Sequence, residues 1–232
     1  MIVSLERALS KLGYCSRKHA AKLIEAGKVS VDGRIITTPN KRVSLESEIK
    51  IDGEQLTEKK TVWIMLNKPK NFLTTIKDPE GRKTVYDIVK LPYHVFPVGR
   101  LDYDTSGLLL MTNDNKLADY ISSPNSKVEK VYVAKVKGNP DLRILGEGTI
   151  LEGQLTIPKK IKLIKSNPNS SIIEITITEG KNRQIKRMFQ AAGIKLITLK
   201  RIAIGSLNID NLKPGQYKFL DAKELKKLKS NQ

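Results

Sequence analysis

Residues 97–114 read PVGRLDYDTSGLLLMTND and place three aspartates beside an apolar run in a basic chain. The run GLLLMT has the composition of a strand. A carboxylate among apolar side chains must be paired or protonated, and both states are costly unless a site needs them. Asp102 is the best candidate for such a site, whereas Asp104 lies in a turn-like stretch and Asp114 in a loop-like one. A single carboxylate argues against an ordinary glycosidase, which uses two.

The charge of the whole chain predicts a polyanionic partner. Its 232 residues include 42 Lys and Arg against 24 Asp and Glu, a formal net charge of +18, which is too large for ordinary surface decoration. The length suits two domains. Glu6 and Arg7 interrupt any apolar leader, and no run approaches the roughly 20 apolar residues of a membrane span. We therefore expect a cytoplasmic protein with no membrane segment.

Cysteine and histidine are too scarce to predict a metal site. Cys15 is the single cysteine of the sequence, so no internal disulfide can form, and the two histidines, His19 and His94, are far apart in the sequence. We expect Cys15 to be a small buried side chain and the protein to need neither a metal nor another cofactor. We expect a monomer, since no oligomerisation helix is evident.

The first 50 residues predict a small helix-helix-strand module. Apolar spacing indicates a helix over 4–12, and Ser16 is a good N-cap for a second helix that ends before Gly27. Three short strands are predicted at 29–31, 34–36 and 48–51, with Asp-Gly turns after the first and the third. Residues 1–45 carry nine basic residues against three acidic ones. This module either binds phosphates through its second helix or has a merely solvated basic face.

A polar stretch without periodicity, EQLTEKKT (54–61), separates this module from the rest of the chain. We place the first domain at 1–54, the linker at 55–61 and a second domain at 62–232. The second domain shows repeated strand-like segments and only one strong helix, at 183–192, without regular βαβ alternation. Its predicted class is α+β, with a mixed, mainly antiparallel central sheet and packed helices.

The helix at 183–192 belongs to a second informative stretch, TEGKNRQIKRMFQAAG (178–193). Asn182 is its predicted N-cap, and an apolar stripe forms its buried face. Arg183, Lys186 and Arg187 share the first turns, where backbone N–H groups also favour anions. This pattern predicts a phosphate-binding helix, with a solvated basic helix as the alternative.

Both domains resemble known families. The sequence SRKHAAKLIEAGKVSVDGRII (16–36) is similar to S4-type RNA-binding domains, a resemblance that covers about residues 3–53. The stretches GRLDYDTSGLLLMTND (99–114), KVYVAKV (130–136) and EGKNRQIKRMF (179–189) resemble, in the right order, the motifs of the bacterial ribosomal RNA pseudouridine synthases of the RsuA and RluB type. These enzymes isomerise a uridine within RNA, so the resemblance implies that nothing is consumed and that no cofactor is needed.

The resemblance also implies roles for individual residues. Asp102 falls on the catalytic aspartate. Lys186, where many relatives have Arg, falls on the cation that pairs with it, and Ile185 falls on a wall of the uracil pocket. Tyr132 is expected to stack on uracil, and its hydroxyl to help move the C5 proton. Arg100 is expected to hold RNA phosphate or to fill the gap left by the flipped base.

The remaining residues implied by the resemblance are RNA contacts. In the second domain they are Lys68 of LNKP, Arg183, Arg187 and Arg201, and in the first domain Arg17, Lys18, Lys22 and Lys28.

Three functions stay open at this point. The first is a site-specific ribosomal RNA pseudouridine synthase acting on 23S rRNA, with 16S rRNA as the alternative substrate. The second is a ribosome-assembly RNA-binding protein without catalysis, and the third, disfavoured by the S4-like module, is a tRNA pseudouridine synthase. The partner is then ribosomal RNA or an assembly intermediate.

Overall fold

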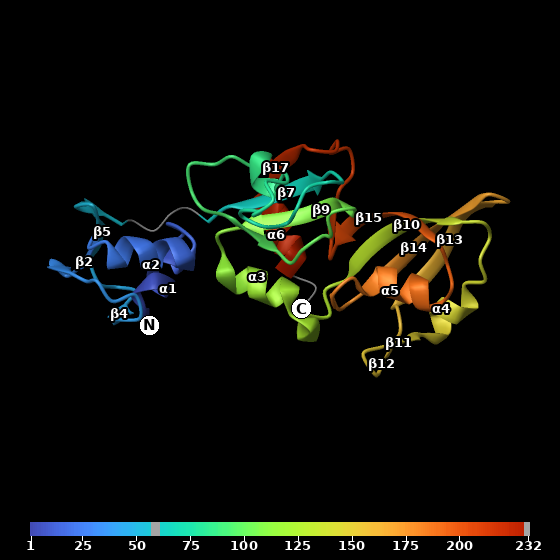
Figure 1. Cartoon of the computed structure of the whole chain (residues 1–232), viewed down its shortest axis with the longest axis horizontal. Helices are drawn as coiled ribbons and strands as arrows, with labels where there is room; N and C mark the ends of the chain where they lie inside the picture. The colour runs from blue at the N-terminus through green and yellow to red at the C-terminus, as the bar shows by residue number, and fades with distance from the viewer. Residues whose placement is uncertain (57–60, 230–232) are drawn as a thin grey trace. The chain divides into compact units, whose positions relative to one another are not determined.

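The computed structural model describes residues 1–56 and 61–229, and the chain divides into two compact units (Figure 1). One unit comprises Met1–Val62, Leu91–Phe96 and Thr112–Asn115, and the other comprises Trp63–Lys90, Pro97–Met111 and Lys116–Gln232. Of the predicted linker, residues 57–60 lie outside the described part of the chain, while Glu54–Gln55 form strand β6.

The helices of the first unit confirm the sequence prediction. Helix α1 spans Leu5–Lys11 and α2 spans Arg17–Glu25. The side chain of Ser16 accepts a hydrogen bond from the backbone N–H of His19 at 3.3 Å, which satisfies one of the free donors at the start of α2. Cys15 is buried, at 8% exposed, and belongs to the apolar core of this unit, as expected.

The strands of this unit form two small sheets. Strand β1 (Ile2–Ser4) pairs with β4 (Arg42–Ser44), and the order of the other sheet is β3-β2-β5-β6. Its strands are β2 (Val29–Val31), β3 (Arg34–Ile35), β5 (Ile49–Ile51) and β6. Both Asp-Gly pairs have positive φ, at 50° and 79° for Asp32-Gly33 and 49° and 85° for Asp52-Gly53. These values suit two-residue hairpin turns, so the predicted turns are confirmed.

The second unit is built on a nine-stranded sheet with the order β13-β14-β10-β15-β9-β7-β17 (Figure 1), in which β16 also pairs with β15 and β8 with β9. The strands are β7 (Trp63–Lys68), β8 (Phe96–Val98), β9 (Ser106–Thr112), β10 (Lys130–Lys137), β13 (Lys160–Asn167), β14 (Ser170–Ile177), β15 (Leu196–Ile204), β16 (Leu207–Asn208) and β17 (Tyr217–Phe219). Strands β9 and β15 run parallel, and the sheet is otherwise mainly antiparallel. The predicted α+β class is therefore confirmed.

Glycine is required where the two parallel strands meet. Gly107 of β9 is in register with Arg201 of β15. A Cβ atom at Gly107 would lie 2.1 Å from the carbonyl oxygen of Arg201, and the φ of Gly107 is +109°. Any larger residue would push the strands apart at the point where the apolar run of β9 begins.

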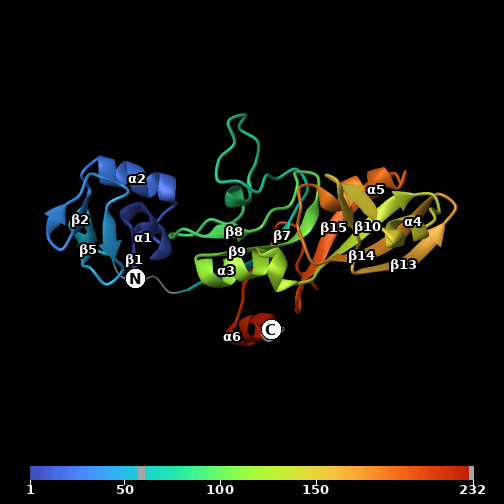
Figure 2. The same cartoon turned by 90° about the horizontal axis from the view of Figure 1, so that it is seen from below.

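The prediction of a single strong helix in this unit is wrong. Besides α5 (Gln184–Ala191), the described residues form α3 (Asn115–Ser122), α4 (Arg143–Glu147) and α6 (Ala222–Lys229). Helix α3 begins among the polar residues 113–115, whose composition suggested a loop. The β11 (Thr149–Leu151) and β12 (Gln154–Thr156) strands form a separate hairpin. Figure 2 shows α5 on one side of strands β10, β14 and β13.

The start of α5 also differs from the prediction. Arg183, not Asn182, is the N-cap residue, with a left-handed φ of 46°. The side chain of Gln184, 3% exposed, accepts a hydrogen bond from Lys181 N at 3.0 Å and donates one to Glu179 at 2.7 Å. A buried glutamine therefore closes the turn and replaces the predicted cap.

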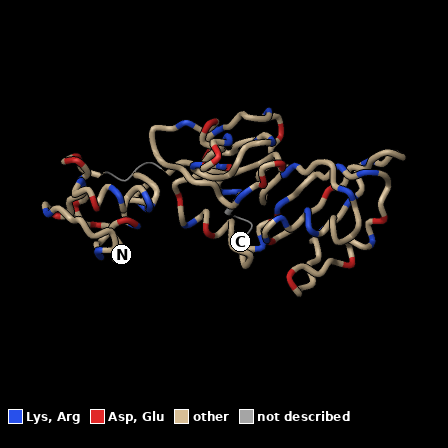
Figure 3. Tube along the Cα trace, viewed as in Figure 1, with Lys and Arg blue, Asp and Glu red and all other residues tan. Residues whose placement is uncertain are grey.

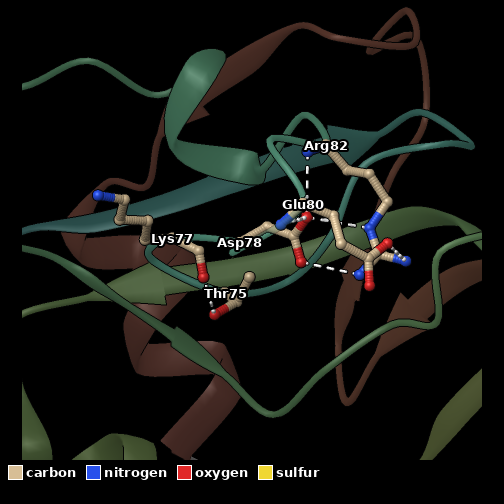
Figure 4. A network of polar contacts seen from close by, with 5 residues as sticks. All are labelled: Thr75, Lys77, Asp78, Glu80 and Arg82. Atoms are coloured by element: carbon tan, nitrogen blue, oxygen red, sulfur yellow. Dashed lines mark hydrogen bonds and ion pairs between the residues drawn. The ribbon is translucent and has the colours of Figure 1, made fainter.

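A loop between Thr74 and Thr84 is held by its own polar contacts (Figure 4). Asp78 accepts hydrogen bonds from the Arg82 side chain at 2.8 and 3.0 Å and from the backbone N–H groups of Glu80 and Arg82 at 3.1 and 3.0 Å. The hydrogen bond from Arg82 lowers the pKa of Asp78 and thereby favours the ionised carboxylate. These contacts close the loop at its turn, and the backbone bridge between Leu73 and Thr84 closes its base.

Candidate active site

A pocket of about 140 Å³ opens on the face of the sheet that carries α5. Its apolar lining includes Ile177, Ile185 and Leu199. The volume is below the roughly 300 Å³ at which pockets for larger small molecules begin, so the pocket suits one small ring. The polar residues at this pocket include Arg100, Asp102, Lys130, Tyr132, Lys186 and Arg201.

Asp102 and Lys186 are brought together at this pocket from positions far apart in the sequence. The Lys186 Nζ lies 3.0 Å from Asp102 Oδ2, with side chains 11% and 33% exposed. Asp102 follows the short strand β8 in the irregular segment before β9, and Lys186 lies in the first turn of α5. The two side chains therefore form an ion pair among the residues that line the pocket.

The sequence did not indicate that Asp104 joins this pair. Its carboxylate also contacts Lys186 Nζ directly, so one ammonium group bridges two carboxylates. Burial raises the pKa of Asp104, but the hydrogen bond and charge of Lys186, together with Arg183, outweigh it and bring the pKa below its usual value. The side chain of Asp104 is 63% exposed, as its position in a turn predicts, but it also forms an ion pair with Lys186 that the turn does not predict.

Three contacts from residues 68–74 hold the segment that carries Asp102. The Thr74 hydroxyl donates to the carbonyl oxygen of Leu101 at 2.8 Å and accepts from its N–H at 3.3 Å. The backbone N–H of Asn71 donates to Tyr103 O at 2.7 Å. Lys68 Nζ donates to Thr105 O at 2.9 Å. The residues on both sides of Asp102 are therefore fixed to a neighbouring segment.

The predicted contact of Lys68 with the RNA backbone is wrong, because its side chain is 0% exposed. Its ammonium also donates to Pro69 O at 3.0 Å. Burial lowers the pKa of Lys68 to about 8, although the charges of Asp104 and Asp102 raise it. Lys68 is thus an internal cation beneath the carboxylates.

Tyr132 and Arg201 are paired across β10 and β15 on the pocket side of the sheet. The Arg201 Nη1 donates to the Tyr132 hydroxyl at 3.3 Å, and Nε donates to Leu108 O at 2.7 Å. Arg201 is 4% exposed, so its predicted role as an RNA backbone contact is wrong. Its Nη2 is buried and has no partner among the described residues. This leaves one guanidinium donor at the pocket without a protein acceptor.

Lys130 also lines this pocket, although the sequence did not single it out. Lys130 lies two residues before Tyr132 and therefore on the same face of β10. This spacing in the sequence could have indicated that Lys130 shares the pocket with Tyr132. Lys130 is 8% exposed and donates to Thr178 O at 3.3 Å. Burial, assisted by the charge of Arg201, lowers the pKa of Lys130 to about 8.

The other predicted residues of this unit lie at or beyond the rim. Arg100 and Arg183 are exposed and line the pocket, and Ile185 forms its wall. Arg187 forms an ion pair with Glu152 at 2.7 Å and does not line the pocket.

The four predicted RNA contacts of the first unit are exposed on or after α2. Arg17 forms an ion pair with Glu6 at 2.8 Å and Lys28 one with Asp52 at 3.5 Å. Lys18 and Lys22 form no ion pair within the described residues.

Residues 1–56 and 61–229 contain no group of three or more His, Cys, Asp or Glu side chains arranged to hold a metal ion. No helix in the same ranges is long and apolar enough to cross a membrane.

Comparisons with known proteins agree with both units. Residues 62–191 match the RNA pseudouridylate synthase family, and residues 4–60 match the S4 domain. The ribosomal large subunit pseudouridine synthase B of Bacillus subtilis is 40% identical over 97% of this chain and 95% of its own. An uncharacterized RNA pseudouridine synthase of Aquifex aeolicus is 39% identical over 98% and 94%. A crystal structure of a pseudouridylate synthase is 30% identical, with a TM-score of 0.67, over 97% of this chain and 99% of that one.

The fold is that of an RNA-modifying isomerase with an appended RNA-binding domain. The chain belongs to the RNA pseudouridylate synthase family, and its S4 domain binds RNA.

Proposed function

We propose that this enzyme converts a specific uridine of ribosomal RNA to pseudouridine, with 23S rRNA as its substrate. The similarity over nearly the whole chain to a synthase named for the large ribosomal subunit supports this substrate. The net charge of +18 supports a long polyanionic partner.

Asp102 is the catalytic residue in this proposal, and its ion pair with Lys186 at the mouth of the pocket is the observation that carries it. The reaction breaks the bond between C1′ and N1 of uridine and forms one between C1′ and C5. C5 loses a proton and N1 gains one, so the product is an isomer. Asp102 either attacks C1′ or removes the C2′ proton. Both routes need an ionised carboxylate, which Lys186 stabilises.

The walls of the pocket suit the base that is released and rejoined. Tyr132 and Ile185 both line the pocket, and in this proposal the ring of Tyr132 and the apolar side chain of Ile185 contact the uracil. The hydroxyl of Tyr132, which accepts a hydrogen bond from Arg201, moves the C5 proton in this proposal. The free Nη2 of Arg201 is a donor suited to a uracil oxygen.

Arg100 is proposed to act outside the pocket. Its side chain is exposed at the rim. A uridine must leave its stack to reach Asp102, at a cost of a few kcal/mol. Arg100 offsets part of this cost by binding phosphate or by occupying the gap in the stack, and exposed Arg183 adds charge on the same rim.

The test is modification mapping on unmodified rRNA. Purified protein is incubated with 23S and 16S rRNA transcripts, and pseudouridine is mapped by carbodiimide-blocked reverse transcription. Asp102→Asn is run in parallel, because it keeps the shape of the side chain and removes its charge. One new stop in 23S rRNA, absent with Asp102→Asn, is the expected result. Stops that persist with the variant would remove Asp102 from the mechanism.

The other candidate functions are distinguished by the same experiment. A stop confined to 16S rRNA would make the small subunit the substrate. Binding without any stop, on free rRNA and on assembly intermediates, would favour a noncatalytic assembly factor. A stop in tRNA alone would favour the third candidate.

A further inference from the structure

We propose that the face of the sheet opposite the active-site pocket is a second RNA-binding surface, which holds RNA beyond the target uridine. The inference rests on the proposed function for the identity of the RNA. The surface, called the lysine face below, is defined by six side chains on β10, β13 and β15: Lys135, Lys137, Lys160, Lys162, Lys165 and Lys200.

The strand register places these lysines on one face. Directly opposed residues of neighbouring strands point to the same side of a sheet. One row across four strands is Lys162, Glu174, Val133 and Lys200, and the next row is Lys165, Ile172, Lys135 and Thr198. Lys160 and Lys137 belong to the rows on either side.

The residues between these rows point to the other face and form the core and the pocket. Tyr132 is in register with Ile175 and Arg201, and all three are buried. Ala134 is in register with Ile173 and Leu199, which are also buried. The same strands therefore carry the pocket on one side and the lysine face on the other.

The charge of the lysine face is nearly unopposed. Glu174 is the one acidic residue at these register positions. Within residues 1–56 and 61–229, none of the six lysines forms an ion pair with a carboxylate. Five of the six are exposed and Lys200 is half-buried. Figure 3 shows Lys and Arg positions on several neighbouring strands in this part of the unit.

The spacing of the charges suits a nucleic acid backbone. Lysines two residues apart on a strand are about 7 Å apart, and those separated by three strand spacings are about 14 Å apart. Several phosphates of one RNA strand can therefore meet the face together, and each contact releases counterions. Because the lysine face and the pocket share β10 and β15, RNA that enters the pocket can continue around the sheet edge at β13.

A simpler role for some of these lysines is protection of an edge. Strand β13 is at one end of the sheet order, and lysines on edge strands discourage pairing with another chain. This role accounts for Lys160, Lys162 and Lys165 but not for Lys135 and Lys200, which lie on the interior strands β10 and β15.

The experiment compares binding of a long and a short RNA by fluorescence anisotropy over a range of KCl concentrations. The long RNA is unmodified 23S rRNA, and the short RNA is one stem-loop excised from it, chosen around the modified uridine when mapping identifies one and otherwise as any single stem-loop of that rRNA. The full-length variant K135E/K162E/K165E is compared with K213E/K223E/K226E. The control has the same net charge, and its three exposed lysines lie in the loop after β16 and on α6.

We expect the lysine-face variant to bind the long RNA at least tenfold more weakly than wild type at 100 mM KCl. The slope of log Kd against log[KCl] should fall by about 2 to 3, since about 0.7 to 0.9 is lost per phosphate contact. Affinity for the stem-loop and both affinities of the control should stay within threefold of wild type. The variant K135Q/K162Q/K165Q removes the three charges without adding carboxylates. Melting curves are recorded for all variants, so that a folding defect is not mistaken for a loss of RNA binding.

Three outcomes would overturn the lysine face as an RNA surface. These are unchanged binding of both RNAs, an equal loss on the two RNAs, and a loss by the control as large as that of the lysine-face variant. A change in oligomeric state with unchanged RNA affinity would assign the lysines to edge protection. Pseudouridine formation on the stem-loop is scored separately, so failure of the proposed function is distinguishable from failure of this inference.

Discussion

The hydroxyl of Thr74 provides the most direct test of how the segment that carries Asp102 is held. Thr74 and Leu101 are both 5% exposed, and the hydroxyl both donates to and accepts from the Leu101 backbone. Thr74→Val keeps the shape of the side chain and removes both hydrogen bonds. Thr74→Ser keeps the hydroxyl and removes one methyl group, so it is the matched control.

The magnitude follows from the two lost bonds. Each contributes about 1 kcal/mol net, and a buried carbonyl left without a donor costs about 1 to 3 kcal/mol. Thr74→Val should therefore lower the free energy of unfolding by about 2 to 3 kcal/mol, against about 0.8 kcal/mol for Thr74→Ser. If the same substitution raises the activation free energy of the reaction by about 2 kcal/mol, the turnover rate falls about 30-fold.

The assay is single-turnover release of tritium from RNA labelled at uridine C5, at several enzyme concentrations, alongside urea unfolding. Thr74→Val should lower the rate constant while the enzyme concentration at half-maximal rate changes less than about threefold, since Thr74 positions Asp102 and does not bind RNA. Thr74→Ser should restore the rate. A rate within threefold of wild type in a destabilised Thr74→Val enzyme, or an equal loss with serine, would refute the positioning argument.

Three further predictions concern the site. The pKa of Lys68 is about 8 in the folded protein and 10.5 in the unfolded reference, so between these values the unfolded state binds more protons and the free energy of unfolding rises with pH. From pH 7 to 9.5, the free energy of unfolding of wild type, measured in urea, should rise by about 2 kcal/mol relative to that of Lys68→Met. A difference that stays constant with pH would contradict the burial argument. Lys186→Arg should retain activity within about tenfold, whereas Lys186→Met should lose at least about 100-fold because Asp102 loses its cation; equal rates for the two would disprove the charge requirement. Tyr132→Phe should lower tritium release about tenfold or more with little change in RNA affinity, and an unchanged release rate would exclude the hydroxyl from proton transfer.

The local features of the first unit could be predicted because short-range rules govern them. Ser16 caps α2 through a contact three residues away, and each Asp-Gly pair adopts the backbone that a two-residue hairpin needs. In the second unit, the K-x-Y pattern likewise indicates that Lys130 and Tyr132 share a face.

Helix α3 was missed for a local reason. It follows polar residues, and its apolar stripe is too short to outweigh their loop-like composition.

Long-range packing explains the failures at the site. Lys68 and Arg201 looked like RNA contacts because the chain is basic, yet both are buried against backbone carbonyls of β9 or the segment before it. Asp104 looked like a turn residue until the fold brought Lys186, 82 positions away, against it. Thr74 carried no signal at all, since its role depends on its contact with Leu101.

The sequence by itself determined the charge, the two domains, the carboxylate at 102 and the motif residues around it, because composition and short-range spacing are properties of the chain alone. The tertiary structure decided which cations are buried and which are free to meet RNA. It also decided that Lys186 serves two carboxylates and that lysines on three strands share one face. These relations depend on sheet register and on the close approach of β9 and β15 at Gly107, and no local pattern encodes the distance between side chains on separate strands.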